Sequence, residues 1–144
     1  MKALGVKLGV PWFQLKDLAK KHGIVAKSSN YSLYGDMSAR MMAVLGRFSP
    51  DQEIYSIDEC FLGMDGFGHL DLAACGQLIR TRIKQCLGLP VCVGFGATKT
   101  LAKLANHAAK KRAGFDGVCD LAALSAAGRD ALLESIDVGE VWGV

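Results

Sequence analysis

Hydrophobic residues recur with helical spacing in five stretches of the chain and gather into short runs in several others. The first helical stretch begins at Pro11, and the second follows Ser29 or Asn30, either of which is a suitable helix cap. Gly23, Pro50 and Gly88 are stop signals for the first three stretches. We therefore expect helices over residues 11–22, 30–48, 70–87, 98–112 and 128–135.

The short apolar runs are rich in β-branched residues and lie between turn residues, which is typical of strands. They predict strands over residues 24–27, 53–57, 60–64, 90–95 and 117–119. From Glu53 the order is strand, strand, helix, strand, helix, strand. This order indicates an α+β fold: an incomplete ferredoxin-like unit with an antiparallel sheet and two helices, whose first strand and helix are lost or altered. The residues before Ser49 would form a small, mostly helical insertion.

Composition agrees with one packed domain, or with one domain plus parts of its neighbours. The chain has 144 residues, 51% of them hydrophobic, and a formal net charge of +3. A mildly basic charge permits a nucleic-acid partner without requiring one. No apolar run approaches the ~18 residues of a membrane span. The first residues form no apolar signal region, so we expect a cytoplasmic protein with no membrane partner.

The five cysteines give no metal or disulfide pattern. Their number is odd and none forms a Cys-x-x-Cys pair. Because all five lie in apolar surroundings, we expect reduced, buried thiols of a cytosolic protein. The cysteines are Cys60, Cys75, Cys86, Cys92 and Cys119.

Two adjacent carboxylates, Asp58 and Glu59, interrupt the paired strand signals. Negative charge at this place is costly unless it is solvated or holds a cation. Carboxylate oxygens at the end of a hairpin suit Mg²⁺, which binds one or two carboxylates together with substrate phosphates. Taken alone, such a pair is more often a solvated turn. Successive side chains of a regular strand point to opposite faces, so both carboxylates reach one site only if the hairpin is distorted or a metal bridges them.

The stretch over residues 98–112 separates basic from apolar positions. Lys99, Lys103, His107 and Lys110 recur near one face at helical spacing, opposite a leucine- and alanine-rich face. A helix N-terminus with a lysine one turn inside it can bind phosphate, because its free N–H groups and its dipole both favour an anion. For an isolated helix, a solvated basic face is the commoner outcome. The glycines before this helix do not form a P-loop.

Several motifs, taken together and in order, resemble those of the Y-family, or translesion, DNA polymerases. Ser56-Ile57-Asp58-Glu59 followed by a small residue and an aromatic is similar to that family's second carboxylate motif. Residues 99–105 match the family pattern Lys-x-x-Ala-Lys-x-Ala, and residues 2–9 match basic-x-x-Gly-Val-x-x-Gly. Residues 137–144 resemble the start of a helix–hairpin–helix thumb.

The resemblance implies roles for particular residues. Asp58 and Glu59 would be catalytic ligands of Mg²⁺. Lys103 would contact the incoming triphosphate, with Lys99 as a helper. Lys2 would hold the place of a triphosphate-binding arginine of some relatives, although a lysine lacks the planar fork of an arginine. Asp65 lies near the far end of the second strand and is not expected to be a ligand.

The resemblance also divides the chain and defines what it lacks. Residues 1–49 would be part of the fingers, 50–120 the palm without its first strand, and 121–144 the start of the thumb. In the family, that first strand carries an aspartate that bridges both metal ions, and next to it stands an aromatic residue that excludes ribonucleotides. We therefore expect a fragment of marginal stability, or one that self-associates, with little or no polymerase activity alone.

The implied reaction transfers a deoxynucleotide from its triphosphate to the 3′-hydroxyl of a primer, by a two-metal mechanism. The implied setting is error-prone repair synthesis in the SOS response to DNA damage, with primer-template DNA, UmuD′, RecA and the sliding clamp as partners. Two alternatives remain open. One is a non-catalytic nucleic-acid-binding module, with Tyr55, Phe61 and Phe95 as stacking residues, although these residues are expected in the core. The other is a nucleotide cyclase with a similar palm.

Overall fold

The computed structural model describes residues 4–6 and 9–143, and it divides into two compact units, Met1–Tyr31 and Ser32–Val144. The first unit contains helix α1 (Trp12–His22), which begins after Pro11 as the sequence predicts. Gly23 ends this helix in the left-handed region, at φ 63°, and its N–H donates to Ala19 O. Residues 24–30 form neither helix nor strand, so the strand expected over residues 24–27 is wrong. Val25 in this segment is 71% exposed.

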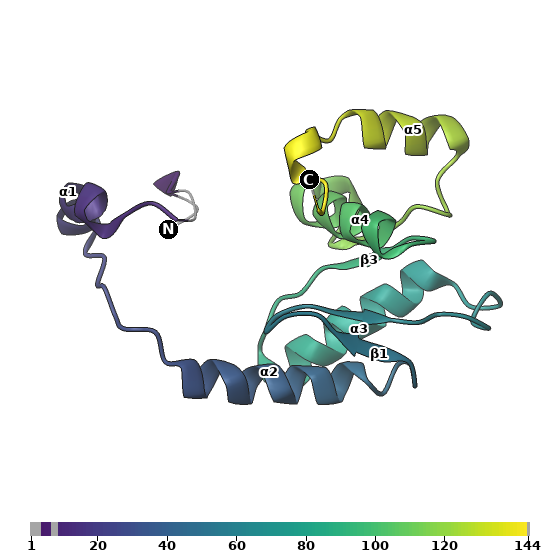
Figure 1. The fold of residues 1–144 in the computed structure, drawn as a ribbon, viewed down its shortest axis with the longest axis horizontal. Coiled ribbons are helices and arrows are strands. Elements are labelled where there is room, and N and C mark those ends of the chain that lie inside the picture. The colour runs from purple at the N-terminus through teal and green to yellow at the C-terminus, as the bar shows by residue number, and fades with distance from the viewer. Residues whose placement is uncertain (1–3, 7–8, 144) are drawn as a thin grey trace. The chain divides into compact units, whose positions relative to one another are not determined.

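The second unit is a mixed α+β structure, as expected, and its elements follow the predicted order (Figure 1). They are α2 (Tyr31–Leu45, whose first residue is counted with the first unit), β1 (Gln52–Ile54), β2 (Cys60–Leu62), α3 (Leu72–Leu87), β3 (Val93–Phe95), α4 (Lys99–Lys111), β4 (Val118–Asp120) and α5 (Ala126–Glu134). Two short 3₁₀ helices, η2 (Ala113–Phe115) and η3 (Val138–Glu140), follow α4 and α5. None of the described helices is long and apolar enough to cross a membrane.

The four strands form two separate sheets. β1 and β2 are antiparallel, with Gln52 opposite Leu62 and Ile54 opposite Cys60. β3 and β4 are parallel, with Val93 opposite Val118. The expected antiparallel sheet is therefore found only in the hairpin. β3 and β4 run parallel because helix α4 connects them, and a crossover of this kind returns the chain in the same direction.

Two hydrophobic clusters hold the second unit together. Met41 and Met42 of α2 pack with Ile79 and Ile83 of α3. The other cluster joins α4 to β4 and α5. Its buried members are Ala105, Ala108, Ala109, Cys119, Leu121 and Leu132. The start of α4 is fixed by the Thr98 hydroxyl, which accepts a hydrogen bond from Leu101 N at 3.2 Å.

Strand β3 lies directly against helix α4, and glycines make this approach possible. A Cβ at Gly94 would lie 2.2 Å from Asn106 N and 2.4 Å from Ala102 O, both of them backbone atoms of α4. A Cβ at Gly96 would lie 2.6 Å from Ala102 N. The glycines before α4 therefore serve helix–strand packing, which places the N-terminal half of α4 beside the strand.

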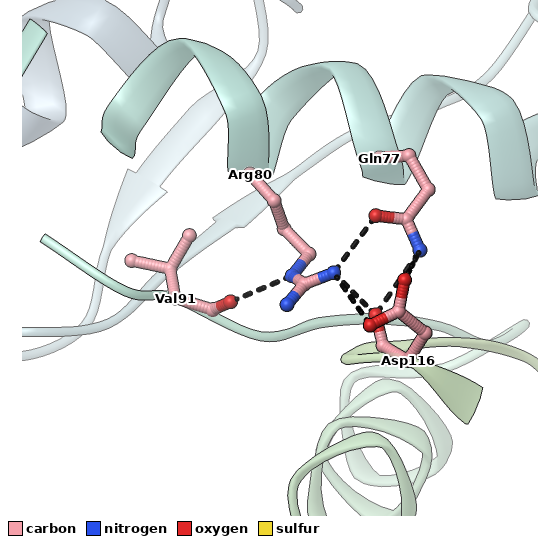
Figure 2. Close-up of polar contacts among 4 residues, drawn as sticks. All are labelled: Gln77, Arg80, Val91 and Asp116. Atoms are coloured by element: carbon pink, nitrogen blue, oxygen red, sulfur yellow. Dashed lines mark hydrogen bonds and ion pairs between the residues drawn. The ribbon is translucent and has the colours of Figure 1, made fainter. Parts of the chain in front are cut away.

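Arg80 of α3 connects three separate segments (Figure 2). Its Nε donates to Val91 O at 3.0 Å, and its Nη1 donates to Gln77 Oε1 at 2.8 Å and to Asp116 O. Gln77 Nε2 also donates to Asp116 O, at 3.1 Å. Asp116 has a positive φ of 44°, which a non-glycine residue adopts only where its surroundings hold it. The Arg80 guanidinium thus fixes the approaches to β3 and β4 against α3.

Replacing Arg80 with methionine is expected to lower the free energy of unfolding by about 2–3 kcal/mol, because two backbone carbonyls lose charged donors. Urea denaturation followed by circular dichroism measures this loss. The matched control is Arg82→Met, on the same helix at an exposed position, where a change within about 0.5 kcal/mol is expected. Equal losses in the two variants would show that the Arg80 contacts contribute nothing specific.

Candidate active site

The two adjacent carboxylates lie in the loop that connects β1 to β2, not within either strand. The loop is closed by hydrogen bonds from Tyr55 N and Ser56 N to Glu59 O, at 3.1 and 3.0 Å. The Ser56 hydroxyl donates to Asp58 Oδ1 at 2.8 Å and accepts from Asp58 N at 3.3 Å. Because the backbone bends here, the alternation of a regular strand does not separate the two side chains. The hairpin is thus distorted at Asp58 and Glu59, which is one of the two ways in which both carboxylates could reach one site.

Asp58 and Glu59 line one cavity of about 160 Å³ between the two sheets. All residues of β2 and of β3 contribute to its wall, and α4 contributes Ala102, Lys103 and Asn106. Asn106 Oδ1 is buried and is the only such side-chain atom in the described part of the chain without a hydrogen-bond partner. Among the described residues, neither β2 nor β3 has a strand partner on its remaining edge. The cavity therefore combines carboxylates and an ammonium group with two unpaired strand edges.

The basic face of α4 is met by carboxylates from three other segments. Lys103 Nζ lies 2.9 Å from Glu59 Oε2, and Lys99 Nζ pairs with Glu53 of β1. His107 Nδ1 lies 3.4 Å from Glu140 Oε2, in η3. Lys99 and Glu53 are 49% and 55% exposed, so the basic face of α4 is withdrawn from solvent only in part, at Lys103 and His107. Lys103 has 21% of its side chain exposed, against 49% for Lys99.

Three aromatic rings lie beside the ammonium groups of Lys99 and Lys103. The rings of Tyr55 and Trp142 meet edge to face, with centroids 5.3 Å apart and an interplanar angle of 87°. Trp142 Nε1 donates to the Tyr55 hydroxyl at 2.9 Å. Phe61 contacts both rings, at centroid distances of 5.9 and 5.8 Å. Lys103 Nζ lies 4.5 Å from the Tyr55 centroid and 5.3 Å from that of Trp142.

The sequence did not indicate this aromatic cluster. Tyr55 was expected in the core, and it is 45% exposed; Phe95, by contrast, is 8% exposed and buried as expected. Tyr55 and Trp142 lie 87 positions apart, and no local pattern connects them. The signal that could have directed attention here was a tryptophan within the glycine-rich segment of residues 137–144.

The remaining predicted site residues are placed as follows. Lys2 lies outside the described residues. Lys99 approaches the Phe61 ring, with its Nζ 5.5 Å from the centroid. Asp65 is exposed and does not line the cavity. No group of three or more His, Cys, Asp or Glu side chains that could hold a metal ion occurs in the described parts of the chain. Asp58 and Glu59 thus supply the oxygen chemistry that Mg²⁺ requires, but only as a pair.

The cysteines are free, and they are less uniformly buried than predicted. Cys119 is buried, Cys60, Cys75 and Cys92 are partly buried, and Cys86 is exposed, which corrects the expectation for that residue. Burial raises the pKa of the Cys60, Cys75 and Cys119 thiols, and the Asp120 carboxylate contributes to the rise at Cys119. The raised pKa values keep these thiols protonated at neutral pH.

Residues 1–107 match the impB/mucB/samB family. The chain therefore belongs to this family of Y-family translesion DNA polymerases, as its motifs indicated. The protein UmuC of Salmonella typhimurium is 47% identical over 145 residues, a match that covers 99% of this chain and 34% of that protein. The protein ImpB of the same species is 44% identical and is also covered over 34% of its length. The chain thus spans about a third of the length of these relatives.

Solved structures share the fold. The insertion ternary complex of Dbh DNA polymerase aligns with a TM-score of 0.80 at 23% identity, over 99% of this chain and 40% of that one. DinB from Sulfolobus solfataricus aligns with a TM-score of 0.76, also at 23% identity. At such identity the likeness establishes the architecture alone. The mixed α+β architecture of the chain is therefore shared with part of each of these structures.

Proposed function

We propose that the chain carries part of the nucleotidyl-transfer site of an error-prone translesion DNA polymerase that acts in SOS mutagenesis and DNA repair. Residues 1–49 are assigned to the fingers, 50–120 to a ferredoxin-like palm without its first strand, and 121–144 to the start of the thumb. The substrates would be deoxynucleoside triphosphates and primer-template DNA. UmuD′, RecA and the sliding clamp would be partners, in the cytoplasm.

One observation carries the proposal: Asp58, Glu59 and Lys103 line the same cavity, although they come from two segments of the chain. The two carboxylates can bind a metal cation, and the ammonium group beside them can bind the phosphate anion that the metal ion accompanies. Family membership supports the proposal, because Asp58, Glu59 and Lys103 all lie within the matched residues 1–107. A solvated turn would not require a lysine of α4 at 2.9 Å from Glu59.

The acidic and basic residues of the site would have different ligands. Asp58 and Glu59 would hold Mg²⁺, which in such sites activates the attacking hydroxyl and neutralises charge on the leaving group. The Lys103 ammonium group would bind the triphosphate, and Lys99, one helical turn nearer the start of α4, would assist it. The partial positive charge of the helix N-terminus favours the same anion.

The site needs a further carboxylate, because a two-metal mechanism requires carboxylate ligands for each of the two ions and Asp58 and Glu59 supply only part of that set. We propose that this group lies on a strand that pairs with the free edges of β2 and β3. The unsatisfied Asn106 Oδ1 at the wall supports this, since a buried acceptor normally has a donor. The 144 residues alone would therefore bind nucleotide but have little or no polymerase activity.

The test is nucleotide binding by this chain. A fluorescent dATP analogue is expected to bind in the presence of Mg²⁺, and Asp58→Asn to weaken that binding about tenfold, as the loss of one charged metal ligand implies. Asp65→Asn is the matched control, because Asp65 is exposed, lies outside the cavity, and should leave binding unchanged. Anisotropy titrations give the affinities, and primer extension by the same preparation is expected to be absent. Equal effects of the two substitutions, or none, would contradict the assignment of Asp58.

A further inference from the structure

The strongest feature outside the proposed metal and phosphate ligands is the contact between Trp142 and the carboxylate hairpin. Trp142 follows η3, close to the end of the chain, yet its indole N–H donates to the hydroxyl of Tyr55, at the start of the loop that carries Asp58. The two rings meet edge to face, a favoured aromatic geometry. The contact therefore joins the segment after α5 to the hairpin.

The same two rings contact the ammonium group of Lys103. Its Nζ lies within 6 Å of both centroids, 4.5 Å from Tyr55 and 5.3 Å from Trp142, the range in which a cation is attracted to an aromatic face. Glu59 Oε2 lies 2.9 Å from the same nitrogen. A lysine side chain has many rotamers, and fixing it costs entropy. The rings reduce that freedom in advance, so Lys103 is held beside the cavity.

A second tie connects the same segment to α4. His107, one turn beyond Lys103 on the helix, lies 3.4 Å from Glu140 of η3. Trp142 therefore belongs to a segment attached to α4 at one point and to the hairpin at another. Lys103 lies between the two attachments, which suits a positioning role for Trp142 better than simple packing of a chain end.

We propose that Trp142, acting with Tyr55, is a positioning residue for Lys103, and that the Trp142 ring responds when Lys103 binds a phosphate. The proposal rests on the proposed triphosphate role of Lys103. When the ammonium group turns from Glu59 toward an anion, it stays in contact with the rings but shifts over the indole face. The segment that follows α5 would in this way be coupled to occupancy of the nucleotide site.

The first experiment tests the contact without any ligand. The chain has two tryptophans, Trp12 and Trp142, so Trp12→Phe leaves Trp142 as the only tryptophan, which can be excited at wavelengths that tyrosine does not absorb. In this background, Lys103→Met is expected to change the Trp142 emission, because the charge leaves the ring. Lys110→Met is the matched control, an exposed lysine of the same helix, and should leave the emission unchanged. Identical spectra for all three proteins would overturn the proposal, whatever the chain binds.

The second experiment measures affinity for Mg²⁺ and dATP by equilibrium dialysis. Trp142→Ala is expected to weaken binding about fivefold, and Trp142→Phe to restore it to within about twofold, since a ring that attracts the cation remains. In a Lys103→Met background, Trp142→Ala should have no further effect, because a positioning residue acts only through the residue it positions. Additive losses would show a general structural role and overturn the proposal. If Lys103→Met itself binds like the wild type, the triphosphate role fails instead, and the emission experiment still decides whether the contact exists.

Discussion

Replacing Gly94 with alanine is expected to lower the free energy of unfolding of the second unit by about 3 kcal/mol or more, the upper range for overpacking a core. The added Cβ would lie 2.2 Å from Asn106 N and 2.4 Å from Ala102 O. Both atoms belong to the backbone of α4, so no side-chain rotation relieves the overlap. The helix would have to move away from β3, and Lys103 and Asn106 would move with it.

Two other glycines calibrate this effect in the same chain. At Gly76 of α3 an added Cβ would meet side-chain atoms, Val118 Cγ1 at 2.6 Å and Phe95 at 3.0 Å, which can shift partly. Gly76→Ala should therefore cost less than Gly94→Ala. Gly35 lies inside α2 with nothing within 4 Å of the added atom, and Gly35→Ala should stabilise by about 0.5–1 kcal/mol through helix propensity. Urea denaturation of the three variants tests the order, and a Gly94 loss no larger than that at Gly76 would contradict this account of β3 packing.

The local features of the fold could be predicted because each depends on residues close in sequence. Gly23 and Gly88 end α1 and α3 in the left-handed conformation, and Thr98 caps α4, all as their residue types suggest. The pairing of the two hairpin strands was also predicted, although β1 ends at Ile54, three residues earlier than expected. In such cases the residues that determine the feature lie within a few positions of it in the sequence.

Contacts between distant segments could not be predicted in the same way. The parallel pairing of β3 and β4 depends on how α4 returns the chain, and no residue of either strand specifies it. The basic stripe of α4 was visible in the sequence, but its partners Glu53, Glu59 and Glu140 come from three other segments. Residues 24–27 were predicted as a strand from their apolar run. They do not form one, because a strand also needs a partner strand to pair with.

In the candidate site, too, the residues could be predicted from local motifs, but the contacts between distant segments could not. Asp58, Glu59 and Lys103 were identified from motifs, and the fold brings them to one cavity. Whether both carboxylates could face that cavity was left open by the sequence, because it depended on the bend at residues 56–58. Trp142 was assigned to the start of the thumb, and its contact with Tyr55 adds a link to the hairpin that no spacing rule contains.

Replacing Glu59 with glutamine is expected to change nucleotide affinity in opposite directions with and without Mg²⁺. Without metal, Lys103 is paired with Glu59, so a triphosphate must displace the carboxylate to reach the ammonium group. Glu59→Gln removes that competition and one negative charge, and should strengthen metal-free binding about fivefold. With Mg²⁺ the same substitution removes a metal ligand and should weaken binding about tenfold.

This reversal follows from the shared use of one ion pair. Binding Mg²⁺ draws Glu59 away and frees Lys103, and binding a triphosphate frees Glu59, so each ligand should favour the other to the same extent. Anisotropy titrations of a fluorescent dATP analogue, in EDTA and in Mg²⁺, measure both arms. Glu53→Gln is the matched control: it removes the same charge beside Lys99, but Glu53 does not line the cavity, so Mg²⁺ dependence should persist. If Glu59→Gln weakens binding equally in both conditions, Glu59 and Lys103 do not exchange partners, and the ion pair is a fixed structural contact.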